Sequence, residues 1–199
     1  MRVRSRWFKS DREKTPEEIA SAVAFIAWRV AQNALKNTRK AHFEVDVGPQ
    51  YFDFMQEFLV FLVQVADRIA HRRQSWNLRV AFITALAHRM GDILAENRGD
   101  LLGESPRDIK SRFIERLNQA AEDYAAFEYE PGGLNFAFVR CLGHAMESVM
   151  HGPDQQWVAD QMMSIEAPEA METLEKAFAN LFDGQPPPPP QTGSVTCPE

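Results

Sequence analysis

The chain has 199 residues, of which 45% are hydrophobic and 25% charged, and its formal net charge is −6. This composition is typical of one globular domain with a sizeable core, and it excludes collagen-like and fully disordered chains. Two cysteines are too few for a disulfide framework, so we expect a protein of a reducing compartment, the cytoplasm. The basic start is not followed by an apolar segment, and no secretory signal is therefore expected.

The charge is distributed unevenly along the chain. Residues 1–40 carry 10 basic and 4 acidic side chains, whereas the last 59 residues carry 1 and 9. Such an asymmetry can guide self-association or a protein partner, and the acidic body disfavours nucleic acid. We expect a basic N-terminal arm at 1–14, an α-helical domain at 15–184 and a disordered proline-rich tail at 185–199, although its proline run could also be a ligand for an aromatic groove.

The first predicted helix runs from the sequence Thr15-Pro16-Glu17-Glu18, which favours a capping box, to about Lys40. An alanine stripe along it permits close packing, either in the core or across a homodimer seam: Ala20, Ala24, Ala27, Ala31 and Ala34. After this helix, residues 42–47 alternate polar and apolar side chains, as residues 2–7 do loosely. A minor two-stranded pairing of these two segments is conceivable, and the fold counts as all-α either way.

The second predicted helix, about residues 50–73, has apolar side chains over an unusually wide arc. One stripe comprises Phe52, Met55, Leu59, Leu62, Ala66 and Ile69, and a second comprises Phe54, Phe58, Phe61 and Val65. This arc is too wide for a helix that is buried on one side only. The helix is therefore either central in a bundle or buried against a partner subunit. Its acidic and basic residues Asp53, Glu57, Asp67 and Arg68 argue against a membrane span.

The later segments predict further helices with ordinary amphipathic patterns. They cover about residues 76–97, with Gly99 and Gly103 loosening the chain, then a segment that begins at Ser105-Pro106, and about 134–151. A shorter helix contains Trp157, Val158, Met162 and Ile165, and the last helix runs from about Pro168 to Gly184. The sequence thus predicts a single-domain all-α bundle of six or seven helices.

Three groups of side chains have the spacing of metal ligands on one helical face. They are Asp67 with His71, His88 with Asp92, and His144 with Glu147 and His151. Each group lies on the polar face of its own helix, so a metal site requires that these faces meet across a cleft. Surface pairs are the simpler interpretation. Asn33, Asn37 and Asn135, on or beside apolar faces, could line a ligand pocket, but interhelical hydrogen bonds or a helix cap explain them more simply.

These patterns leave three hypotheses for function. The first is a non-enzymatic protein-interaction or regulatory module that acts as a homodimer, because the wide arc of the second helix and the alanine stripe offer more apolar surface than a small bundle needs. The second is a metal-dependent enzyme or sensor that uses the histidines and carboxylates above. The third is a carrier or sensor of a small apolar ligand among phenylalanines and methionines. No organic cofactor is expected and no catalytic residue is assigned.

Overall fold

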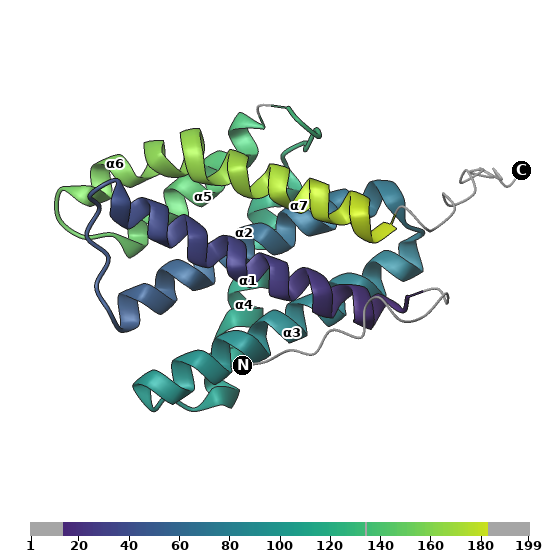
Figure 1. Cartoon of the computed structure of the whole chain (residues 1–199), viewed down its shortest axis with the longest axis horizontal. Helices are drawn as coiled ribbons and strands as arrows, with labels where there is room; N and C mark the ends of the chain where they lie inside the picture. Colours follow the sequence, from purple (N-terminus) through teal and green to yellow (C-terminus); the bar gives the residue numbers. More distant parts are fainter. Residues whose placement is uncertain (1–13, 134, 183–199) are drawn as a thin grey trace, which may run out of the picture.

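The computed structural model describes residues 14–133 and 135–182, and over these ranges the chain folds as an all-α bundle without strands (Figure 1). This confirms the predicted fold class. Its helices are α1 (Pro16–Lys40), α2 (Pro49–Arg73), α3 (Trp76–Leu102), α4 (Pro106–Ala125), α5 (Phe136–Val149), α6 (Asp154–Gln161) and α7 (Ala167–Phe182). One π-helical turn, η1 (Met162–Glu166), joins α6 to α7 without a break. None of the described helices is both long enough and apolar enough to span a membrane.

The start of α1 is the capping box that the sequence predicts. The Thr15 hydroxyl accepts the backbone N–H of Glu18 at 3.3 Å, and the Glu18 carboxylate accepts the N–H of Thr15 at 3.1 Å. These bonds satisfy N–H groups that no helical carbonyl can reach. Ser105 precedes α4 at the corresponding position but makes no side-chain cap bond. Of the sequence Ser105-Pro106 that predicts this helix start, only the proline at the first helical position has its expected place.

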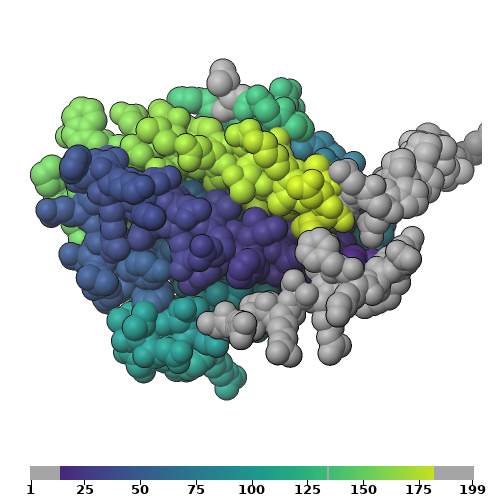
Figure 2. All heavy atoms as spheres, viewed as in Figure 1, coloured from purple at the N-terminus to yellow at the C-terminus, as the bar shows by residue number. Residues whose placement is uncertain are grey.

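Helix α2 is the centre of the bundle, which confirms the first of the two interpretations of its wide apolar arc. It packs against α1, α3, α4, α5 and α7, and both of its apolar stripes are buried. In the space-filling view, α1 and α7 form most of the face toward the reader and cover this core (Figure 2). The alanine stripe of α1 is also buried inside the chain, where α1 packs mainly on α3 and α7. A partner subunit is therefore not needed to cover either surface.

Two helix boundaries differ from the predicted ones for local reasons. Helix α3 continues through Gly99 to Leu102 and ends where Gly103 adopts a left-handed conformation with φ of 70°. A β-carbon at Gly99 would lie 3.2 Å from the carbonyl oxygen of Glu104, so this glycine serves the tight turn into α4 rather than ending the helix. Helix α5 begins at Phe136 because Asn135 is left-handed and bonds to the backbone of Glu130.

Residues 42–47 form a turn and an irregular connection rather than a strand, and His42 has a positive φ of 69°. The segment predicted to pair with it, residues 2–7, lies outside the described residues. So do the rest of the basic arm before Lys14 and the proline-rich tail at 185–199.

Candidate functional site

The polar face of the central helix α2 is covered by arginines from α3 and α4. Arg98 donates to Asp53 at 2.7 Å, and Arg116 pairs with Glu57 at 2.8 Å. Arg79 binds both carboxylate oxygens of Asp67, at 2.7 and 2.6 Å. Guanidinium groups thus supply the positive charge at this face of α2. The other predicted metal ligands, on α3 and on or just after α5, take no part in these ion pairs.

The predicted pair Asp67 and His71 is held by the same arginine. The third guanidinium nitrogen of Arg79, Nη1, lies 3.1 Å from His71 Nδ1. The hydrogen bond to Asp67 raises the pKa of the Arg79 guanidinium further above its ordinary value, so Arg79 stays charged. A divalent metal between Asp67 and His71 would have to displace this guanidinium.

The other predicted metal ligands are spread over the surface. Lys110 binds Asp92 at 2.5 Å, and His88 is exposed beside them. His144 and Glu147 pair with each other at 3.0 Å on the exposed side of α5, and His151 lies exposed beyond its end. Across the described ranges, no group of three His, Cys, Asp or Glu side chains could hold a metal ion.

The phenylalanines of α2, which the carrier hypothesis would use to line a pocket, contact aromatic rings of the chain itself. The ring of Phe61 lies 6.0 Å from Phe138 and 6.4 Å from Tyr124, measured between centroids, and Tyr124 and Phe138 are 4.7 Å apart. These are ordinary edge and tilted contacts of a filled core. The space around them is thus occupied by the protein's own side chains.

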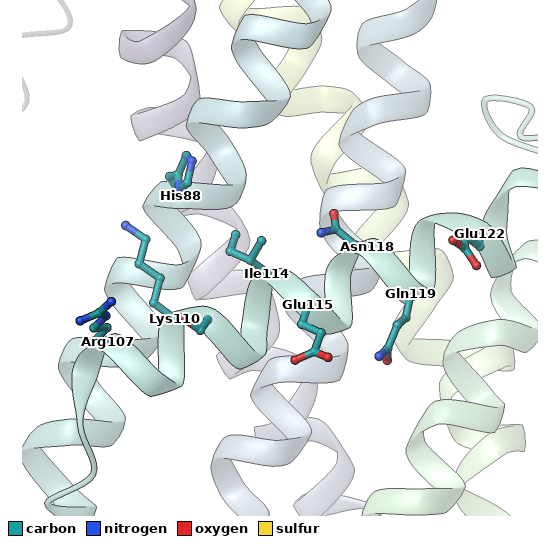
Figure 3. Close-up of a pocket in the computed structure, with 9 residues that line it drawn as sticks. His88, Arg107, Lys110, Ile114, Glu115, Asn118, Gln119 and Glu122 are labelled. Atoms are coloured by element: carbon teal, nitrogen blue, oxygen red, sulfur yellow. The ribbon is translucent and has the colours of Figure 1, made fainter.

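An open groove lies where α3 and α4 diverge (Figure 3). The two helices are close at Gly91, where a β-carbon would lie 3.2 Å from Lys110 and 3.3 Å from Phe113. Farther along, α4 leaves α3 and packs on α2, where Arg116 meets Glu57. His88 of α3 lines the groove, with residues of α4 that run from the basic end to the acidic end: Arg107, Lys110, Ser111, Ile114, Glu115, Asn118, Gln119 and Glu122.

One face of α3 packs against α4 in the second half of the helix. In the first half, the same face carries apolar side chains that are exposed. At about 100° per residue, Val80 and Thr84 lie within about 20° of the direction of Gly91. Thr84 is exposed, Val80 is 45% exposed and Trp76, about 60° from Gly91 at the same spacing, is 62% exposed. The uncovered α3 face, defined by Trp76, Val80 and Thr84, is therefore a helix-packing surface without a helix on it.

Two segments of the sequence beside the groove differ in charge, although only His88 of the first and Asn118, Gln119 and Glu122 of the second line it. Residues 68–91, which include the uncovered α3 face, contain five arginines, two histidines and no acidic residue. Residues 117–133, which include the second half of α4, contain four acidic residues and no lysine or arginine. Arg73 is exposed, and no ion pair involves it among the residues that the structure describes.

Sequence reasoning missed both this surface and one buried carboxyl. Val80 and Trp76 continue the apolar face of α3, but a helical pattern does not tell where the next helix departs. Glu166 is 2% exposed and occupies a buried stripe with a spacing of four residues, Val158, Met162, Ala170 and Leu174. An acidic residue inside such a stripe is a signal that could have been found. Of the three asparagines, Asn37 makes an interhelical bond to Glu166, and Asn33 is exposed. Asn135 stands at the N-cap position of α5, but its side chain bonds to the backbone of the preceding loop and makes no cap bond to the helix. No family model, curated protein or solved structure matches this chain.

Proposed function

We propose that the protein is a non-enzymatic interaction module that forms a homodimer through the uncovered α3 face and the adjoining groove. The observation that carries this proposal is the exposure of Trp76 and Val80 on the side of α3 that packs against α4 at Gly91. Large apolar side chains on a helix-packing face are stabilised when another helix covers them. The wide apolar arc of α2, which first suggested a dimer, is covered by the chain itself. The uncovered α3 face therefore takes its place as the proposed contact with a second copy.

Charge complementarity favours a second copy as the occupant. A dimer with a two-fold axis uses the same surface on both subunits. If α3 of each copy lies along the groove of the other, the acid-free segment 68–91 of one copy comes near the acidic segment 117–133 of the other, and this happens twice. Opposite potentials across an interface speed association and fix its register.

We propose the cytoplasm as the compartment, because two cysteines do not make the framework typical of small secreted domains.

The variant Val80→Asp tests this surface. It places a carboxylate at the centre of the uncovered α3 face, where dimerisation would bury it, and it should weaken self-association at least about tenfold. The matched control is Val47→Asp, which adds the same charge at a side chain that is 90% exposed in the connection before α2. Light scattering after size exclusion measures the mass of both variants over a range of concentrations.

The two variants should separate clearly. Wild type and Val47→Asp are expected to share one dimer dissociation constant, while Val80→Asp is monomeric at the same concentrations. Equal masses for all three proteins would place any dimer interface elsewhere. A monomeric wild type that captures a defined acidic helical peptide, with Val80→Asp losing that binding, would show that the face serves a different partner and would contradict the homodimer.

A further inference from the structure

Glu166 is a carboxyl group buried at the junction of α1, α6 and α7. It is 2% exposed and is the last residue of η1, where the N–H of Ala167 bonds to the carbonyl of Met162. This five-residue hydrogen-bond spacing is rare and commonly occurs at functional positions. Its place in the buried stripe of α6 and α7 directs the side chain toward α1 instead of solvent.

The partners of the Glu166 carboxyl are neutral amides. Gln161 Nε2 donates to Oε1 at 2.9 Å, and Asn37 Nδ2 of α1 lies 3.5 Å from Oε2. An amide group can donate N–H to a carboxylate, or turn and accept O–H from a carboxylic acid. The site can therefore hold either protonation state, but it offers no cation to compensate a buried negative charge.

The charged residues around this junction do not supply that compensation. On α1, Lys36 and Lys40 are exposed, and on α6 Asp160 is exposed. On α5, Arg140 is exposed and His144 pairs with Glu147. Within the described part of the chain, no ion pair reaches Glu166, and Glu169 on α7 adds a like charge.

We propose that Glu166 makes the docking of α6 and α7 on α1 sensitive to protons: the neutral acid holds the helices together, and ionisation loosens them. Burial raises the pKa of the Glu166 carboxyl above its usual 4.5, the hydrogen bonds from Gln161 and Asn37 lower it in part, and the charge of Glu169 raises it. When the junction opens, water reaches the carboxyl and its pKa returns toward the usual value. The closed state therefore binds the proton more tightly than the open state does. The stability that this proton gives the closed state is lost as pH rises through the raised pKa.

Hydrogen exchange of α6, η1 and α7 measures this opening. After division by the intrinsic exchange rate at each pH, the opening constant of wild type should rise above pH 4.5, by up to tenfold for each unit by which burial raises the pKa of Glu166. Glu166→Gln keeps the shape of the side chain and its amide partners but removes the carboxyl that binds the proton. The opening constant of this variant should therefore not change with pH. Glu169→Gln, one turn farther along on the exposed side, is the matched control and should retain most of the wild-type rise.

A second measurement separates this proposal from a simple loss of packing. The carboxyl carbon shift of Glu166 in wild type, followed by NMR through a pH titration, should give a midpoint above 4.5, the usual value for a glutamate. An ordinary midpoint, or an opening constant with the same pH dependence in wild type and Glu166→Gln, would overturn the proposal.

Discussion

Single residues set the distance between helices in this bundle, and Gly143 on α5 shows how. A β-carbon at this position would lie 3.2 Å from both Cγ and Sδ of Met163 and 3.3 Å from Cβ of Ala159. A side chain at this position would therefore make Met163 or Ala159 shift by a few tenths of an ångström. The pairing of α5 with α6 and η1 thus depends on the absence of a side chain, and η1 is the turn that holds Glu166.

We predict that Gly143→Val destabilises the protein by about 1 to 3 kcal/mol, because the added atoms must push Met163 and Ala159 away. Ala137→Val, at an exposed position on the same helix, is the control for placing a β-branched side chain on α5 without a close neighbour, and it should cost less than about 0.7 kcal/mol. Urea unfolding monitored by circular dichroism measures both. Equal losses in the two variants would mean that α5 and η1 can separate without cost.

At the scale of elements, the polar face of α2 shows how a helix can be central and still carry charges. The Glu57 side chain is 11% exposed and Arg116 of α4 is 26% exposed, so their pair is largely shielded from water. Such a pair adds little net stability over apolar residues, yet removing one member leaves an uncompensated charge. The arginines of this face therefore fix the positions of α3 and α4 on α2 more than they stabilise the fold.

A double-mutant cycle tests that interpretation. Arg116→Ala should lower the free energy of unfolding by about 1 to 3 kcal/mol, and adding Glu57→Gln to it should recover a large part of the loss. Lys176→Ala is the control, because its pair with Glu172 is exposed on both sides and should contribute less than about 0.5 kcal/mol. If the double variant is no more stable than Arg116→Ala, the loss comes from packing by the arginine stem and not from the stranded carboxylate.

The elements that the sequence predicts well are those whose burial shows in a local pattern. The two apolar stripes of α2 repeat every three or four residues, and this alone indicates a helix with neighbours on several sides. The ion pairs of α2 could not be predicted, because Asp53 and Arg98, or Glu57 and Arg116, are joined only by the packing of distant segments. The same holds for the groove: the face of α3 is visible in its periodicity, but the departure of α4 from it is a property of the assembled bundle.

At the scale of the whole molecule, the core is complete within one chain, and large apolar side chains of α3 remain exposed outside it. The apolar arc of α2 and the alanines of α1 are covered by neighbouring helices, and the uncovered α3 face presents Trp76 and Val80 near segments of opposite charge. Attraction between charges near a surface is screened by salt, whereas apolar contact is not. A dimer built on this face should therefore weaken as ionic strength rises, without dissociating completely.

Sedimentation equilibrium of the wild-type chain tests the proposed homodimer most directly, at micromolar concentrations and at two salt concentrations. We expect a species of twice the 22.7 kDa mass of the chain, with a dissociation constant that increases at high salt. A mass of one chain at every concentration and at low salt would contradict the proposed homodimer.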